Sequence, residues 1–273
     1  MVNLSNVSFR YAGQKNPVFQ DFSMQLHENR IYGLLGKNGT GKSTLLYLVA
    51  GLLRPQQGTV TIDGETADER RPSMLQELFI VPEEFDLPSI TLDEYVRLNS
   101  PFYPHFSREV LERCLESFEL PTKLNLHSLS MGEKKKVYVS FALAAGTRLL
   151  LMDEPTNGLD IPSKSQFRKV VAENMTDDRT LLISTHQVHD VEALLEHLLI
   201  LSKSNILLDM SMAELTERYA FELQAPGAMD SSVIYAEPTL MGNMVLKQRT
   251  EGSVETQVNL ELLFNAVTKG LVR

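Results

Sequence analysis

Hydrophobic residues alternate with polar ones in short runs near the start of the chain, and this pattern predicts half-buried β-strands. A first run lies between Leu4 and Phe9, and a second lies between Phe22 and Leu26. Another strand pair is expected around residues 59–64, where Asp63-Gly64 is typical of a tight turn. These elements predict a small antiparallel β subdomain at the N-terminus.

Continuous apolar runs replace this alternation further along the chain. Residues 149–152 are Leu-Leu-Leu-Met, and residues 181–183 are Leu-Leu-Ile. Such runs are expected of parallel strands in a sheet that helices cover on both faces. A third apolar run, Ile31 to Leu35, precedes a helical pattern from Thr44 to Leu53. Strands followed by helices in this order predict an α/β fold.

Apolar residues recur every three or four positions between about residues 89 and 145, which predicts helices. Leu92, Val96, Leu111 and Leu115 follow this spacing, and prolines interrupt the region at three positions. We therefore expect a helical insertion at about residues 85–145, within the α/β core.

The pattern changes again after Asp209. The segments expected as strands are residues 221–224, 233–236, 244–247 and 254–258, and a helix is expected from Leu260 to Val267. The sequence thus predicts a main domain of residues 1–210 and a small α+β appendage of residues 211–273.

The composition narrows the classes of partner and site. The 35 acidic and 26 basic residues give a net charge of -9, which disfavours nucleic acid as a partner. The single cysteine, Cys114, excludes an intrachain disulfide and fits a reducing cytoplasm, and we expect it to pack in a helix. Neither a secretory signal nor an apolar run of about 18 residues is visible, so another chain must supply any membrane part.

A phosphate loop lies between the third apolar run and the helical pattern that follows it. Residues 36–43 read Gly-Lys-Asn-Gly-Thr-Gly-Lys-Ser, which matches G-x-x-x-x-G-K-[ST]. Glycines let the backbone N–H groups close around phosphates, Lys42 reaches the β- and γ-phosphates, and Ser43 offers a hydroxyl to Mg²⁺. The residues expected to hold the nucleotide are Gly36, Lys37, Asn38, Gly39, Thr40, Gly41, Lys42, Ser43 and Thr44. A merely glycine-rich turn is the alternative, and the flanking strand and helix argue for a P-loop NTPase core.

Two carboxylates, Asp153 and Glu154, follow the buried run at residues 149–152. The carboxyl end of a parallel strand is where α/β sheets place ligands. Because hard cations prefer oxygen ligands, Asp153 is expected to hold Mg²⁺, and Glu154 is expected to take a proton from the attacking water. An acidic turn without a function is the alternative.

Together these motifs resemble an ABC-type ATPase over residues 1 to about 210. The segments that carry the resemblance, in order, are the phosphate loop, Leu129-Ser130-Met131-Gly132-Glu133, Leu150-Leu151-Met152-Asp153-Glu154-Pro155, Gly158-Leu159-Asp160 and Ser184-Thr185-His186. The resemblance implies that Ser130 and Gly132 face the γ-phosphate held by an opposite subunit and that Asp160 joins the two sites. It further implies that His186 acts at the γ-phosphate beside Glu154 and Lys42, and that Tyr11 stacks on adenine.

Several of these residues have a purely structural interpretation when taken singly. Ser130 is also a good helix N-cap, and His186 is also an ordinary histidine beside a strand. Tyr11 competes with Phe9 for the adenine role. The order of the five motifs favours the functional interpretation.

The sequence departs from the family pattern at two places. Glu83 occupies the position where the family usually has a Gln that contacts Mg²⁺ and senses the membrane partner, and the resemblance implies that its carboxylate takes this place at the nucleotide and the metal with altered charge. The signature has Met131 and Glu133 where Gly and Gln are commoner. Residues 134–136, all Lys, are interpreted as the basic face of the signature helix, with a nucleic-acid patch as the alternative.

The resemblance implies a working unit of two chains that binds ATP and Mg²⁺, in which the second chain is a copy or a paralogue. It implies a polytopic membrane permease as partner, contacted around Glu83 to Tyr95, and a cytoplasmic place at the inner face of the membrane. Together with the C-terminal appendage, it resembles stand-alone ATPase subunits of bacterial exporters. A soluble ATPase of iron–sulfur cluster assembly is the alternative, because that class shares Glu133-Lys134-Lys135.

Overall fold

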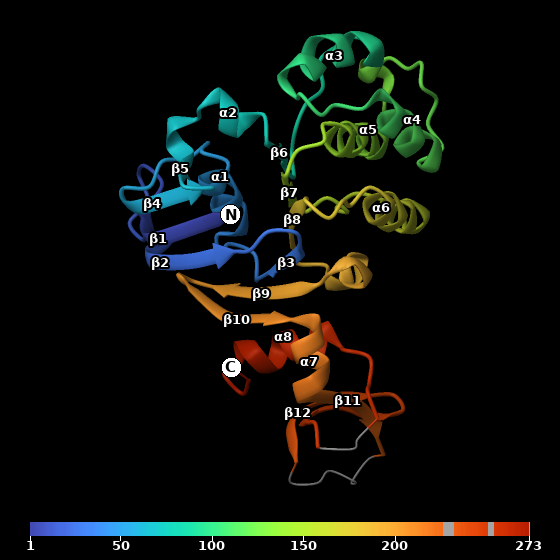
Figure 1. Ribbon diagram of the computed structural model, residues 1–273. Helices are drawn as coiled ribbons and strands as arrows, with labels where there is room; N and C mark the ends of the chain where they lie inside the picture. The colour runs from blue at the N-terminus through green and yellow to red at the C-terminus, as the bar shows by residue number, and fades with distance from the viewer. Residues whose placement is uncertain (226–231, 251–253, 273) are drawn as a thin grey trace.

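The computed structural model describes residues 1–225, 232–250 and 254–272, whose strands form three sheets (Figure 1). The strands are β1 (Val2–Phe9), β2 (Phe19–Leu26), β3 (Ile31–Leu35), β4 (Gln57–Ile62), β5 (Glu65–Thr66), β6 (Leu78–Val81), β7 (Leu149–Asp153), β8 (Thr180–Thr185), β9 (His197–Ser202), β10 (Asn205–Ser211), β11 (Tyr219–Gln224), β12 (Val233–Thr239) and β13 (Gly242–Gln248). The α-helices are α1 (Lys42–Val49), α2 (Pro72–Leu75), α3 (Leu92–Asn99), α4 (Arg108–Ser117), α5 (Met131–Ala144), α6 (Ile161–Glu173), α7 (Met212–Arg218) and α8 (Leu260–Thr268).

The N-terminal sheet is antiparallel and has the order β2-β1-β4-β5, as the alternating pattern predicts. In its register, Val2 lies opposite both Leu26 on β2 and Ile62 on β4. The β4–β5 hairpin turns at Asp63 and Gly64, which both have positive φ. The predicted antiparallel subdomain is therefore present.

The central sheet has the order β10-β9-β3-β8-β7-β6, and only β10 runs antiparallel to its neighbour. Successive residues of β7 point into two different cores, because Leu149 and Leu151 join the core beneath α1 and the N-terminal sheet while Leu150 and Met152 join the core beneath the other helices. Both faces are covered, which explains the continuous apolar runs. The predicted α/β class is confirmed.

The helical insertion holds α3, α4 and α5, which lie together at the β6 edge of the central sheet (Figure 1). Phe141 on α5 packs at ring-centroid distances of 5.9 Å from Phe79 on β6 and 5.1 Å from Tyr95 on α3. These contacts join the insertion to the strand that precedes Glu83. Cys114 lies in α4 and is buried, as expected, and burial raises the pKa of its thiol to about 12.

The helix after the phosphate loop is shorter than the sequence pattern suggests. It begins at Lys42, two residues before the predicted start, and it ends at Val49 rather than Leu53. Gly51 explains this end, because it adopts φ +65° and a Cβ there would lie 2.1 Å from the Ala67 carbonyl oxygen. Only glycine fits such a turn without displacing the backbone.

The C-terminal segment forms a three-stranded antiparallel sheet of order β11-β13-β12, followed by α8. Three of the four expected strands and the helix are confirmed. The strand expected at residues 254–258 is wrong, since this segment has no regular structure. Its Thr256 side chain accepts a hydrogen bond from the Phe221 N–H at 2.8 Å, so a side chain takes the place of a backbone ladder. Residues 226–231, between the first two of these strands, lie outside the described residues.

The appendage shares its core with the main domain. Buried residues of α8, among them Leu260, Leu263 and Ala266, belong to the same cluster as Phe167 on α6 and Leu198 on β9. Figure 1 shows α8 beside β10, with β11 and β12 further out. The predicted boundary at residue 211, between the main domain and the appendage, stays a prediction. The buried residues of α8 belong to the core of the main domain and not to a separate core.

No helix in the described part of the chain combines the length and the apolar character that crossing a membrane requires.

Candidate nucleotide site

The phosphate loop connects the end of β3 to the start of α1, so its backbone lies at the carboxyl edge of the central sheet. A Cβ at Gly36 would lie 2.6 Å from the Thr40 Oγ1 and 2.8 Å from the Leu201 carbonyl oxygen, which requires glycine there. The Thr40 hydroxyl donates to the Lys37 carbonyl at 2.8 Å and closes the loop. The α1 N-terminus follows directly, and its free N–H groups and dipole favour phosphate.

Lys42 is buried at the base of the loop. Its ammonium donates to the Gly36 carbonyl at 2.9 Å and lies 3.7 Å from the Glu154 Oε1. A buried ammonium needs such partners because its desolvation is costly. The same cation is therefore available to phosphate oxygens once they replace the loop carbonyl.

Asp153 ends β7 directly opposite Ser184 on β8, and its Oδ1 accepts a hydrogen bond from the Ser184 hydroxyl. Burial raises the pKa of Asp153, and the hydroxyls of Ser184 and Ser43 partly offset this effect. Among the described residues the Oδ2 of Asp153 is buried without any hydrogen-bond partner. A buried, unpartnered carboxylate oxygen beside a serine hydroxyl fits a hard cation such as Mg²⁺.

Glu154 follows Asp153 and is held at both carboxylate oxygens. Its Oε1 lies 2.8 Å from the His186 Nδ1, and its Oε2 accepts a hydrogen bond from the Thr185 hydroxyl at 3.0 Å. The Glu154 backbone has φ +46°, which costs a non-glycine residue about 1–3 kcal/mol. Such strain persists only where the surroundings hold it, and here it directs a carboxylate beside the phosphate loop.

Glu83 comes two residues after β6, and its carboxylate meets the turn that follows Glu154. Its Oε1 accepts a hydrogen bond of 2.9 Å from the Asn157 side-chain amide. Asn157 itself lies three residues after Glu154, and its N–H donates to the Glu154 carbonyl at 3.1 Å. The carboxylate at the unusual position is thus tied to the turn after β7.

Tyr11 lies next to the start of α1. Its hydroxyl is 3.1 Å from the Thr44 Oγ1, and its ring meets the Phe9 ring edge-on with centroids 4.9 Å apart. Phe9 is buried in the core of the N-terminal sheet, whereas Tyr11 is half-buried and borders the site. Of the two aromatic residues, only Tyr11 is placed to meet a bound base.

These side chains surround one cavity of about 590 Å³. The residues that line it are Tyr11, Gln14, Val18, Asn38, Gly39, Gly41, Lys42, Ser43, Thr44, Glu83, Glu154, Asn157 and His186. The structure therefore gathers most of the predicted site residues. The predicted residues that do not line this cavity are Gly36, Lys37, Thr40, Ser130, Gly132, Asp153 and Asp160.

The comparisons with known proteins come from sequence families, single relatives and solved structures. The family described as "ABC transporter" matches residues 19–157. Nod factor export ATP-binding protein I of Cupriavidus pinatubonensis is 31% identical over 256 residues, which cover 88% of this chain and 74% of that protein. The chain belongs to the ABC transporter family.

Other similarities agree with this membership. ABC transporter ATP-binding protein YtrB of Bacillus subtilis is 28% identical over 80% of this chain and 75% of that protein. A solved ATP-binding subunit of an ABC transporter aligns with TM-score 0.69 and 25% identity, over 79% of this chain and 91% of that one. A dimeric ATP-binding cassette bound to ADP and Pi has the same fold, with TM-score 0.68 and 23% identity. The chain is an ATP-binding subunit of the ABC transporter family and an ATPase.

Within this ABC subunit the signature residues lie at the start of α5, where Ser130 and Met131 are exposed and Gly132 is half-buried. Ser130 caps the helix: its hydroxyl accepts from the Glu133 N–H at 3.4 Å, and the Glu133 Oε2 accepts from the Ser130 N–H at 2.8 Å. Asp160 caps α6 in the same way by accepting from the Ser163 N–H at 2.9 Å. Ser130 is therefore the N-cap of α5 within this chain. It is also exposed, so a second chain could contact it.

Sequence reasoning missed two residues of this ABC site, Asn157 and Lys135. The interpretation of residues 134–136 as a basic face is wrong for Lys135, which is 5% exposed and donates to the carbonyls of Glu154 and Asn157. Lys135 precedes the buried Val139 by four positions, and this helical spacing was the available signal. Because the middle lysine points inward, the run does not form a continuous basic surface for nucleic acid.

The C-terminal helix α8 of this ABC subunit also reaches the site. Phe264 borders a second cavity of about 290 Å³ together with Lys37, Asn38 and His186. The Glu261 Oε2 lies 3.4 Å from the Nε2 of His189, which is three residues after His186. The appendage therefore contacts the loop after β8.

Proposed function

We propose that this chain is the ATP-hydrolysing subunit of an ABC exporter, and that it dimerises around two ATP and drives a separate membrane subunit. The observation that carries this proposal is the cavity shared by the phosphate loop, Glu154 and His186, which the signature serine Ser130 does not line. A site that has its phosphate loop but lacks its signature residues is complete only when another chain contributes them.

Within the site each residue has a proposed role. Lys42 and the loop N–H groups neutralise the phosphates, Glu154 polarises the attacking water, and His186 stabilises the γ-phosphate in the transition state. Tyr11 stacks on adenine. From the opposite chain Ser130 and Gly132 contact the γ-phosphate through the start of α5, and Asp160 joins the two sites.

Mg²⁺ would be held by Ser43 and Asp153, whose unpartnered Oδ2 supports this assignment. The ion, when bound, neutralises charge on the β- and γ-phosphates. The Glu83 Oε1 accepts a hydrogen bond from Asn157. We propose that any contribution of Glu83 to the metal shell comes from its other carboxylate oxygen, Oε2.

Export is proposed as the direction because of how far the similarity to an export protein extends. The relative named for Nod factor export is 31% identical and its alignment covers 88% of this chain. The zinc uptake ATP-binding protein ZurA of Listeria innocua is 28% identical and its alignment covers 78% of this chain. No relative named here supports the iron–sulfur assembly alternative.

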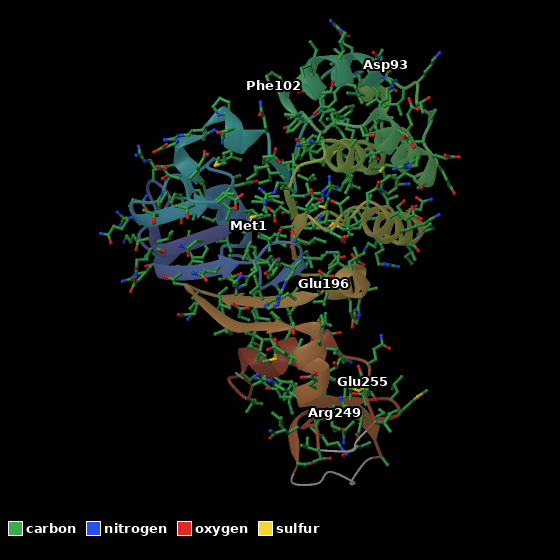
Figure 2. The ribbon with its side chains drawn as sticks, viewed as in Figure 1. Met1, Asp93, Phe102, Glu196, Arg249 and Glu255 are labelled. Carbon is green, nitrogen blue, oxygen red and sulfur yellow. The ribbon has the colours of Figure 1, made fainter. Side chains whose placement is uncertain are left out.

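The permease is proposed to dock in an apolar cavity of about 500 Å³ between β6 and the helical insertion. Residues on its walls include Leu52, Phe79, Phe102, Tyr103 and Tyr138. Phe102 is 66% exposed at the edge of the helical insertion (Figure 2). A short apolar helix of a membrane subunit fits this chemistry. The cavity borders β6 rather than the Glu83–Tyr95 segment that the resemblance implies.

Replacing Phe102 by Glu is expected to lower co-purification of the permease about tenfold or more, because a carboxylate enters an apolar contact. The measurement is a pull-down of tagged protein from detergent-solubilised membranes with Mg-ATP, followed by mass spectrometry. Leu240→Glu is the matched control, since Leu240 is fully exposed on the distant β12–β13 turn. Equal recovery with Phe102→Glu and wild type would assign the permease to another surface, and recovery of soluble proteins alone would overturn the transporter proposal.

A further inference from the structure

Lys135 is a buried cation that forms no ion pair with any residue in the described part of the chain. It lies on α5, one turn after the Ser130 cap, and is 5% exposed. Its ammonium donates hydrogen bonds to the backbone carbonyls of Glu154 at 3.2 Å and Asn157 at 2.9 Å. A charge in the interior is unfavourable unless its surroundings compensate it. A lysine at this position must therefore contribute something that a buried apolar residue could not.

The two carbonyls belong to the turn that carries the proposed catalytic carboxylate. Glu154 has φ +46°, and its carbonyl accepts from both the Lys135 ammonium and the Asn157 N–H. The carbonyl of Asn157 completes the contact at the other end of the turn. Lys135 thus holds both ends of a four-residue segment whose first residue is in a strained conformation.

The same turn connects Lys135 to Glu83. The side-chain amide of Asn157 donates to the Glu83 Oε1 at 2.9 Å while the backbone carbonyl of Asn157 accepts from Lys135. Burial lowers the pKa of Lys135, and the carboxylates of Glu83, Glu154 and Asp153 partly offset this effect. The unusual acidic residue at position 83 and the buried lysine therefore face each other across Asn157.

We propose that Lys135 is a positioning residue of the ATP site: its ammonium fixes the Glu154–Asn157 turn and, through Asn157, compensates the negative charge of Glu83. The assignment rests on the proposed role of Glu154. It also means that the start of α5, the turn after β7 and Glu83 are mechanically connected inside one chain. A displacement of the signature helix is then transmitted to the catalytic carboxylate.

Replacing Lys135 by Met tests this role, because Met keeps the length of the side chain and removes its donors and charge. We expect kcat for ATP hydrolysis to fall about 10- to 100-fold while KM for ATP changes less than about threefold, as displacement of one catalytic group predicts. Lys136→Met is the matched control. Lys136 is the next residue on α5 and its ammonium contacts the side chain of Gln166 rather than the catalytic turn, so its kcat should stay within about twofold of wild type.

The coupling to Glu83 is tested in the same assay. In a Glu83→Gln background the loss of kcat on replacing Lys135 by Met should be at least about threefold smaller than in wild type, because the charge at position 83 that Lys135 compensates is gone. An equal loss of kcat in both backgrounds would contradict the proposed coupling between Lys135 and Glu83. A Lys135→Met protein with wild-type kcat would contradict the positioning role of Lys135.

A lower kcat and an unchanged melting temperature support the proposal, whereas a rise in KM alone would assign Lys135 to nucleotide binding and overturn it. If Lys135→Met fails to fold, Lys135→Gln, which keeps an amide donor, decides by the same kcat and KM criteria. Absence of ATP hydrolysis by the wild-type subunit with its permease would contradict the proposed function instead, so the two failures are distinguishable.

Discussion

Glu154→Gln protein is expected to bind ATP about as tightly as wild type, to lose about 10²–10³ or more in hydrolysis rate, and to accumulate as an ATP-bound dimer. The amide is nearly isosteric, but it cannot accept a proton from water. Binding is retained because the change removes a negative charge 3.7 Å from the Lys42 ammonium and leaves that cation free for phosphate. The dimer persists because ATP that is not hydrolysed keeps the two chains together.

Two measurements check this expectation: phosphate release at saturating ATP, and light scattering after size exclusion with and without Mg-ATP. Glu173→Gln is a suitable control, since Glu173 is exposed at the end of α6 and its carboxylate contacts only Lys169 among the described ion pairs. Hydrolysis above a tenth of the wild-type rate would remove Glu154 from the role of base. A monomer at saturating ATP would contradict the two-chain site.

Lys42→Ala protein should bind ATP at least about 100-fold more weakly, because two charge-assisted hydrogen bonds to phosphates are each worth about 1.5–3 kcal/mol. The electrostatic surroundings enlarge this effect. Glu154 and Glu83 line the cavity and Asp153 is buried beside it, so without Lys42 the site repels anions. Titration with a fluorescent ATP analogue gives the affinity directly.

The control for this variant is Lys203→Ala. Lys203 is exposed in the turn after β9, close in sequence to Leu201, whose carbonyl lies against Gly36. It removes one lysine charge without touching the loop. Since Lys42 is buried, the melting temperature of each variant must be measured as well. An affinity within about fivefold of wild type in a folded Lys42→Ala protein would refute the assignment of this lysine to the phosphates.

The parts of the fold that the sequence predicts correctly are those that residues close together in the chain determine. The apolar runs of β7 and β8 and the glycines of the phosphate loop act within a few residues, so their strands and loop could be predicted. The strand expected at residues 254–258 failed because a tertiary contact, the bond from the Phe221 N–H to Thr256, decides the conformation there. The early end of α1 likewise depends on Ala67, which lies far along the chain from Gly51.

The same distinction applies to the site. Asp153 and Glu154 were visible because they end a buried strand, whereas Lys135 was misread because three adjacent lysines look like a solvated face. Its role depends on Glu154 and Asn157, which α5 meets only in the folded chain. The opposite-chain roles of Ser130 and Asp160 stay predictions, because one chain contains only half of each proposed site.

Cys114 has a practical consequence for observing this ATPase at work. The only thiol of the chain is 1% exposed on α4, and its pKa of about 12 leaves it protonated at neutral pH. Since the thiolate is the reactive form, maleimide dyes should not label Cys114. One cysteine could be introduced at the exposed start of α5 and another at the tip of the β12–β13 turn. Labels on them would then report distances between paired subunits, without any need to remove the native cysteine first.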